Sequence, residues 1–219
     1  MGDSADLLSA WDELDTASVA DALDAEGLHG AVIGLQSFGV HDRVVGLAYT
    51  VRYLPGDSAR GSVGDYIDDV DDCHVVVIDN GGRIDCTVWG GILSEVAVSR
   101  GVRATVIDGA CRDVAHAQQA GYRLFARARH TRTGKDRCVL DGVGVTVRLG
   151  DVRVDSADIV IADADGVVVV PARHQNRVHE RALKIQAAEA TILESIRSGT
   201  TLAEARRAAN YFGLQRKHS

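Results

Sequence analysis

Three short apolar segments alternate with two helical patterns in the middle of the chain, and this alternation constrains the fold more than any other feature. The apolar segments have the length and composition of strands that are covered on both faces, and they span residues 74–79, 104–108 and 123–126. The two helical segments, at about 91–100 and 113–120, are each followed by a glycine, as helices commonly are. This order of elements predicts βαβ units and therefore a partly parallel sheet.

Shorter elements are expected on either side of this core. Before it we expect a helix over 14–24 with Asp15 or Thr16 as its cap, a loop over 28–38, a strand over 43–53 and a short helix over 62–70. Within and after it we expect a turn at Asn80-Gly81-Gly82, a hairpin of 158–163 and 166–170, a long helix over 175–197 and a capping box from Thr201 to Glu204.

The 219 residues show no internal repeat and no Pro/Gly-rich linker, and one large domain can accommodate this length. We therefore expect a single domain over residues 1–219, with a core at about 14–200 and C-terminal helices at about 175–210. The predicted fold class is α/β.

Charge and cysteine content argue against several classes of protein. The net charge is −7, and a negative field disfavours nucleic acids and anionic membrane surfaces as partners. Without an apolar run of about 18 residues or an apolar leader, we expect no membrane span and a cytoplasmic protein. The cysteines show no metal-binding spacing and are interpreted as free thiols: Cys73, Cys86, Cys111 and Cys138. Arg112 could lower the pKa of the Cys111 thiol, but we interpret Cys111 as a packing residue.

Two turns beside the predicted sheet carry residues that could bind a ligand or take part in catalysis. Gly90 and Gly91 open the first helix of the core, and free backbone N–H groups at a helix start can receive a carboxylate or a phosphate. Arg112 and Asp113 follow the second strand, and they combine a bidentate anion ligand with a hard oxygen donor for Mg²⁺ or Mn²⁺. Each turn also has a purely structural interpretation, as a tight connection and as a helix cap. Their position after a buried strand favours a function.

The two turns and their flanking segments resemble one known family. Trp89-Gly90-Gly91-Ile92-Leu93 and Val106-Ile107-Asp108-Gly109-Ala110-Cys111-Arg112-Asp113-Val114 are similar to the RraA-like family, which includes the metal-dependent 4-hydroxy-4-methyl-2-oxoglutarate/4-carboxy-4-hydroxy-2-oxoadipate aldolases. The resemblance covers roughly residues 14–200. It implies a single-domain α/β sandwich with a swivelling-domain-like β core, helical N- and C-terminal segments, and assembly as a homotrimer or as a hexamer.

The resemblance also implies roles for individual residues. Arg112 would bind the carboxylate of a small 2-oxo acid, and Asp113 would hold Mg²⁺ or Mn²⁺ directly or through water. The substrate-binding backbone would come from Gly90, Gly91, Ile92 and Leu93. The implied reaction is cleavage of a C–C bond of the 2-oxo acid through a metal-stabilised enolate, either as retro-aldol cleavage that releases pyruvate or as decarboxylation of oxaloacetate.

One position departs from the pattern of these aldolases. They carry an acidic residue twenty-one positions before the arginine, and here that residue is Gly91. The candidates for a substitute are Asp79, Asp85 and Asp108. The candidate for an assisting acid from a neighbouring subunit is Glu189, with Glu180 as the second choice.

Two further functions remain open at this stage. Gly91 favours a non-catalytic regulator that binds a ribonuclease or another protein, whereas Asp113 favours an enzyme, because the inhibitor branch of the family usually lacks that aspartate. A family member with a changed substrate is the other alternative, in which the basic loop Arg132-Thr133-Gly134-Lys135 could contact a larger anion. The histidines show no catalytic spacing and are interpreted as structural or surface residues, including His74, His116 and His130.

Overall fold

The computed structural model describes residues 2–39, 43–56 and 63–215, and its strands and helices are as follows. The strands are β1 (Ala31–Val32), β2 (Gln36–Ser37), β3 (Val44–Pro55), β4 (His74–Thr87), β5 (Ala104–Cys111), β6 (Leu124–Arg129), β7 (Cys138–Val143), β8 (Val147–Leu149), β9 (Val152–Val154), β10 (Ile159–Ala162) and β11 (Val167–Val170). The helices are α1 (Gly2–Ser9), α2 (Thr16–Ala25), α3 (Gly91–Ser99), α4 (Val114–Gln119), α5 (Gln175–Arg197), α6 (Leu202–Ala208) and α7 (Tyr211–Leu214), with 3₁₀ turns η1 (Asp65–Asp69) and η2 (Ala172–His174).

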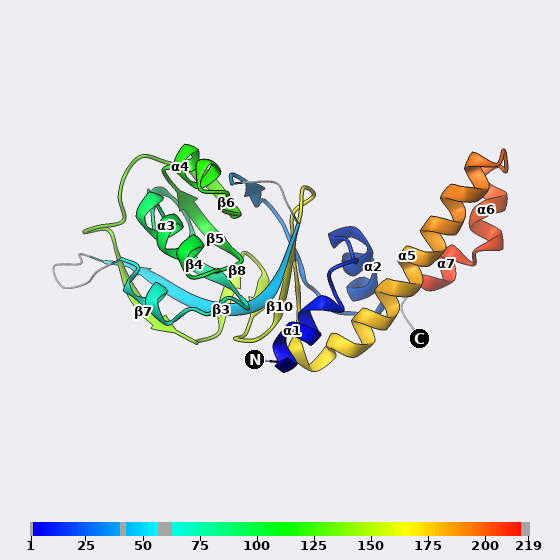
Figure 1. Cartoon of the computed structure of the whole chain (residues 1–219), viewed down its shortest axis with the longest axis horizontal. Helices are drawn as coiled ribbons and strands as arrows, with labels where there is room; N and C mark the ends of the chain where they lie inside the picture. Colours follow the sequence, from blue (N-terminus) through cyan, green and yellow to red (C-terminus); the bar gives the residue numbers. More distant parts are fainter. Residues whose placement is uncertain (1, 40–42, 57–62, 216–219) are drawn as a thin grey trace.

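One mixed sheet forms the centre of the molecule (Figure 1). Within the described residues, nine strands form this sheet in the order β1-β11-β10-β3-β4-β5-β6-β2, with β7 paired to β3, and β8 pairs with β9 alone. The predicted βαβ core is confirmed, because β4, β5 and β6 are parallel and α3 and α4 connect them. The turns that follow β4 and β5 therefore lie at the same edge of the sheet. The predicted α2, β3, α5, β10–β11 hairpin and capping box are also confirmed.

Some predicted boundaries were wrong. The chain does not turn at Asn80, and β4 continues to Thr87, because Gly81 and Gly82 adopt positive φ angles of 60° and 69° that shift the register with β5 without ending the strand. β5 extends to Cys111, so Asp108 lies inside the strand and not at its end, where it was predicted. The loop expected over 28–38 contains β1 and β2, which pair with β11 and β6. The short helix expected over 62–70 is the turn η1, and residue 62 lies outside the described residues.

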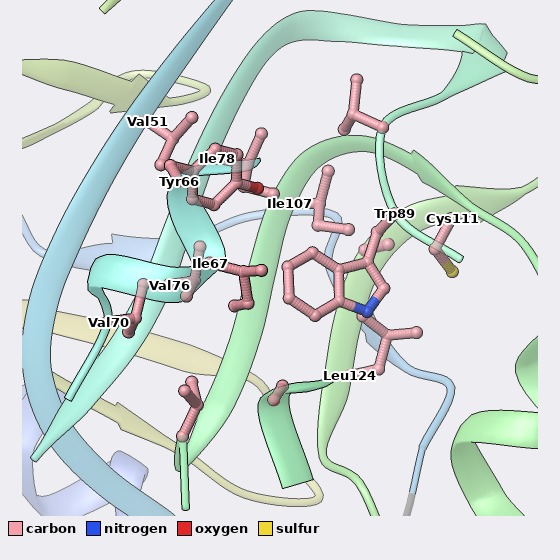
Figure 2. Packing of buried hydrophobic residues seen from close by; sticks show 14 of the residues in the cluster. Val51, Tyr66, Ile67, Val70, Val76, Ile78, Trp89, Ile107, Cys111 and Leu124 are labelled. Atoms are coloured by element: carbon pink, nitrogen blue, oxygen red, sulfur yellow. The ribbon is translucent and has the colours of Figure 1, made fainter. Parts of the chain in front are cut away.

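Two apolar layers cover the two faces of the sheet around β4 and β5. On one face the strands pack against side chains of η1, α3 and α4, with Trp89 and Tyr66 among the largest (Figure 2). On the other face they pack against the β8–β9 hairpin through Val147, Leu149, Val152 and Val154. This double coverage explains why residues 75–78 are continuously apolar, since alternate side chains enter the two layers.

The terminal helices pack at the opposite end of the molecule from α3 and α4 (Figure 1). α2 and α5 cover β10 and β11 through a third apolar cluster that includes Leu23, Ile161, Val168, Val178 and Ile185. α5 then extends beyond the sheet, with α6 and α7 packed against it (Figure 1). None of the helices in the described ranges is long and apolar enough to cross a membrane.

Candidate active site

The turns after β4 and β5 meet at one edge of the sheet. β4 leads through Trp89 to the start of α3, and β5 leads directly to Arg112. The backbone N–H of Arg112 donates to the carbonyl oxygen of Trp89 at 3.0 Å, so the two turns are joined through their main chains. The parallel pairing of β4 and β5 thus places Arg112 and Asp113 beside Gly90 and Gly91.

Asp113 turns its carboxylate back towards α3. Its backbone is in the left-handed region, with φ 57° and ψ 37°, and Oδ2 accepts a hydrogen bond from the Gly91 N–H at 2.9 Å. Negative charge is stabilised at a helix N-terminus, so this position suits a carboxylate. The side chain makes no capping hydrogen bond to α4, and the interpretation of Asp113 as the cap of the following helix is wrong. Its second oxygen, Oδ1, has no partner among the described residues.

Arg112 lies beside this carboxylate and is open to solvent. Its Nε is 3.5 Å from Asp113 Oδ2, and 41% of its side chain is exposed. A Cβ at Gly90 would lie 2.9 Å from Asp113 Oδ2 and 3.1 Å from Arg112 Nε. Because the φ of Gly90 is −153°, an extended angle that any residue adopts, the position requires the absence of a side chain and not a special backbone conformation.

A cleft of about 400 Å³ opens at these residues. The start of α3 lines it together with Arg112 and Asp113, and η1 lines it with Asp65 and Asp68. Ile92 also lines the cleft and is 82% exposed, so part of its rim is apolar. Asp65 and Asp68 were not predicted from the sequence, because the acidic residues of η1 have no spacing that connects them to Arg112.

The start of α3 has fewer free N–H groups for a ligand carboxylate than its two glycines predict. The N–H of Gly91 is already bonded to Asp113. The N–H groups of Ile92 and Leu93 have no hydrogen-bond acceptor within the described part of the chain, and both residues line the cleft. A ligand carboxylate can therefore receive these two donors while it contacts Arg112.

The space next to Gly91 is occupied by an imidazole. A Cβ at Gly91 would lie 3.2 Å from Cγ of His116 and 3.4 Å from Cβ of Asp113. Nε2 of His116 in turn lies 2.7 Å from Oε1 of Glu95, and both side chains are about half exposed. An acid at position 91 would have to displace this ring. The His116–Glu95 contact between α4 and α3 therefore occupies the space beside Gly91.

The three aspartates considered as substitutes lie outside the cleft. Asp79 accepts hydrogen bonds from Gly81 N and Arg148 N, at 2.9 and 3.0 Å. Asp85 is paired with Arg83, and that hydrogen bond lowers the pKa of the carboxyl. Asp108 is 4% exposed and paired with Arg127. The carboxylates that share the cleft with Asp113 are those of Asp65 and Asp68.

The two glutamates proposed as assisting acids lie on α5, at the far end of the molecule from α3 (Figure 1). Glu189 accepts a hydrogen bond from the hydroxyl of Tyr211 on α7. Glu180 lines a separate small cleft with Glu26 and Arg181. A contribution of either residue to the cleft at Arg112 would therefore have to come from a neighbouring subunit, and it stays a prediction.

Two other sequence-based expectations concern residues beside the cleft. Cys111 is fully buried, and this burial raises the pKa of its thiol to about 12, although the charge of Arg129 acts to lower it. It is a packing residue in the cluster around Trp89 (Figure 2). From the basic loop Thr133 lines the cleft and forms a β-bridge with Thr87, whereas Arg132 and Lys135 are not among the lining residues.

The carboxylate oxygens of Asp113 are suitable ligands for a hard divalent cation that keeps most of its bound water molecules. In the described ranges, no three or more His, Cys, Asp or Glu side chains are grouped so that they could enclose a metal ion. Mg²⁺ does not require such a cage, because it usually binds one or two carboxylates together with substrate oxygens and water. Oδ1 of Asp113 can be the carboxylate oxygen that binds such an ion, on the Arg112 side of the cleft.

The mixed sheet and this cleft define an α/β protein in which an arginine, a carboxylate and the start of a helix lie together at one edge of the sheet. The profile of the RraA-like family, described as Aldolase/RraA, matches residues 16–169. The chain therefore belongs to the RraA-like family, and the predicted α/β class is confirmed.

Individual relatives agree with this assignment. A protein of Halalkalibacterium halodurans named "Putative 4-hydroxy-4-methyl-2-oxoglutarate aldolase" is 30% identical over 184 residues, which are 83% of this chain and 84% of that protein. Protein DlpA of Legionella pneumophila is 34% identical over 91% of this chain, but this chain spans only 33% of the length of DlpA. The crystal structure of an uncharacterized Pseudomonas syringae protein superposes with a TM-score of 0.85, at 38% identity, over 92% of this chain and 97% of the other.

Proposed function

We propose that this protein is a divalent-metal-dependent lyase that cleaves a C–C bond of a small 2-oxo acid, either by retro-aldol cleavage that releases pyruvate or by decarboxylation of oxaloacetate. The observation that carries the proposal is the pairing of Arg112 with Asp113 at the start of α3, in a cleft that a small acid can enter. Membership of a family that contains proteins named for 4-hydroxy-4-methyl-2-oxoglutarate aldolase activity supports it.

Each residue of the cleft has a separate role in the proposed reaction. The guanidinium of Arg112 and the N–H groups of Ile92 and Leu93 bind and orient the substrate carboxylate. Asp113 would hold Mg²⁺ or Mn²⁺, and the bound ion would supply the positive charge that polarises the keto oxygen of the substrate. Asp65 or Asp68, each of which also lines the cleft, accepts the proton of the substrate hydroxyl in the retro-aldol direction and returns it to the carbon that becomes the methyl group of pyruvate.

Assembly is part of the proposal. α5, α6 and α7 extend away from the sheet and leave large apolar side chains exposed, including Leu193 (52%), Leu202 (46%) and Phe212 (57%). Apolar surface of this kind is stabilised by burial against another subunit. We infer a homotrimer or a hexamer in which α5 of one subunit brings Glu189 towards the cleft of the next. A monomer in light scattering would contradict this part of the proposal.

The function is tested by pyruvate release. The protein is incubated with 4-hydroxy-4-methyl-2-oxoglutarate or oxaloacetate, and pyruvate is measured with lactate dehydrogenase, in excess Mg²⁺, in excess chelator, and after Mg²⁺ is restored. We expect turnover that chelation abolishes and Mg²⁺ restores, because Arg112 is engaged with the substrate carboxylate and the charge that develops on the keto oxygen depends on the metal ion. Full turnover in chelator would refute the metal dependence, and no turnover with either acid would refute the lyase.

Gly90→Ala is expected to reduce activity without reducing stability. The added Cβ meets Oδ2 of Asp113 and Nε of Arg112 and displaces both side chains, while the extended backbone accepts alanine. A displacement near 1 Å in a reacting site can cost about 10²-fold, so we expect pyruvate release to fall about 10- to 100-fold with little change in the melting temperature. Gly56→Ala is the control, because the atoms nearest to its Cβ among the described residues belong to the apolar side chain of Val139. Equal activity of the two variants would contradict the assigned geometry.

A non-catalytic regulator is the second candidate function, and the glycine at position 91 is the observation that favours it. Its signature would be stoichiometric capture of a partner protein, such as a ribonuclease, together with the absence of lyase turnover. The presence of Asp113 with a free carboxylate oxygen favours the lyase. A changed specificity that depends on Arg132 and Lys135 is the least favoured, since neither residue lines the cleft.

A further inference from the structure

A second cleft adjoins the first at Arg112 and Asp113. It has a volume of about 340 Å³, and its other lining residues are Val114, Arg129, His130 and Thr131. The pairing of β5 with β6 creates it: Cys111 lies opposite Arg129, and the His130 N–H donates to the Cys111 carbonyl at 2.9 Å. The residues that follow the two strands, Arg112 and His130, therefore emerge side by side at the same edge of the sheet.

The lining of this second cleft is cationic although the protein carries a net charge of −7. The exposed guanidinium of Arg129 has neither a hydrogen bond nor an ion pair among the described residues. His130 Nδ1 accepts a hydrogen bond from Arg132 N at 2.9 Å, so the neutral ring carries its proton on Nε2 and keeps one donor unused. The anionic group present is Asp113, which is already bonded to Gly91 and lies beside Arg112.

We propose that Arg129 and His130 form the subsite for the second carboxylate of the diacid substrates named above, and that these two residues determine the preference for a diacid over a monoacid. The inference rests on the proposed function, because it places the first carboxylate of the substrate on Arg112. Since Arg112 lines both clefts, an acid bound there can extend its other end into the neighbouring one. A diacid then satisfies the free donors of Arg129 and His130, whereas a monoacid leaves them in water.

The test uses two ligands that lack the 4-hydroxyl group and cannot undergo retro-aldol cleavage. 2-Oxoglutarate carries the second carboxylate, and 2-oxopentanoate has the same chain with a methyl group in its place. Dissociation constants are measured by calorimetry in excess Mg²⁺ for the unsubstituted protein, for Arg129→Gln and for His130→Asn. Arg197→Gln is the matched control, because it removes an exposed arginine from the end of α5.

We expect the unsubstituted protein to bind 2-oxoglutarate more tightly than 2-oxopentanoate. One hydrogen bond to a charged group corresponds to about a tenfold to hundredfold change in affinity. Arg129→Gln should therefore weaken the affinity for 2-oxoglutarate by about this factor and leave the affinity for 2-oxopentanoate unchanged. His130→Asn should produce a smaller loss in the same direction, and Arg197→Gln none.

The outcomes separate this inference from the proposed function. Equal affinity for the two acids in the unsubstituted protein, or an unchanged preference in Arg129→Gln, would overturn the second subsite while Arg112 still binds a 2-oxo acid. No binding of either acid would overturn both proposals. A melting temperature of each variant close to that of the unsubstituted protein shows that a loss of affinity is local.

Discussion

Asp113→Asn is expected to retain the fold and to lose pyruvate release by about 10²–10³-fold, the range observed when a group that stabilises developing charge is removed. Asparagine tolerates the left-handed conformation at φ 57°, and its carbonyl oxygen can still accept the hydrogen bond from Gly91 N. The substitution therefore removes the negative charge alone, which is the property that a divalent cation requires. Activity is measured by pyruvate release in excess Mg²⁺, and the fold by thermal unfolding.

The chain offers a matched control for this variant. Asp136 also has a left-handed backbone, with φ 62°, and it is not among the residues that line either cleft. Asp136→Asn should therefore keep its activity. An Asp113→Asn protein with the turnover of the unsubstituted protein would show that the carboxylate serves only as a cap of α3.

Arg127→Met is expected to cause the largest loss of stability, about 3–5 kcal/mol in the free energy of unfolding, because it leaves a buried carboxylate without its counter-ion. The Asp108 side chain is only 6% exposed and is paired with the guanidinium of Arg127, and its Oδ2 accepts the Gly150 N–H at 3.1 Å. Arg127 also donates to the carbonyl oxygen of Ile33 at 3.1 Å, so its loss affects two turns. Urea unfolding followed by circular dichroism measures the effect.

The control and the rescue both test the cause of this loss. Arg153→Met breaks an ion pair whose arginine is 66% exposed, and such surface pairs contribute about 0–1 kcal/mol. Asp108→Asn in the Arg127→Met background removes the unpaired charge and keeps an acceptor for Gly150, so it should recover part of the stability. A loss in Arg127→Met no greater than that in Arg153→Met would contradict the assignment.

The alternation of strands and helices was enough to predict the parallel centre of the sheet, because continuous apolar strands and glycine-terminated helices are local signals. The same signals failed at Gly81 and Gly82, where positive φ angles bend β4 and let it continue. β1 and β2 were missed because two-residue strands have no periodicity, and only their pairing with β11 and β6 defines them.

The residues of the candidate site also differ in whether the sequence could predict them. Arg112 and Asp113 are contiguous and follow a strand, so the sequence indicated them together with the glycines of α3. Asp65, Asp68, Arg129 and His130 come from other elements, and only the folded chain places them around the same two residues. The reversal of the Asp113 carboxylate towards Gly91 depends on one left-handed residue, which the sequence does not indicate.

A crystal structure with Mg²⁺ and oxalate, which mimics the carboxylate and keto oxygens of a 2-oxo acid, tests the central assignment most directly. We expect an oxalate carboxylate on the guanidinium of Arg112 and the N–H groups of Ile92 and Leu93. We also expect Mg²⁺ within roughly 2.1 Å of an Asp113 oxygen or of a water bound to it, the usual Mg–oxygen distance. Oxalate and Mg²⁺ bound away from Arg112 and Asp113, or a cleft without either at saturating concentrations, would contradict the account.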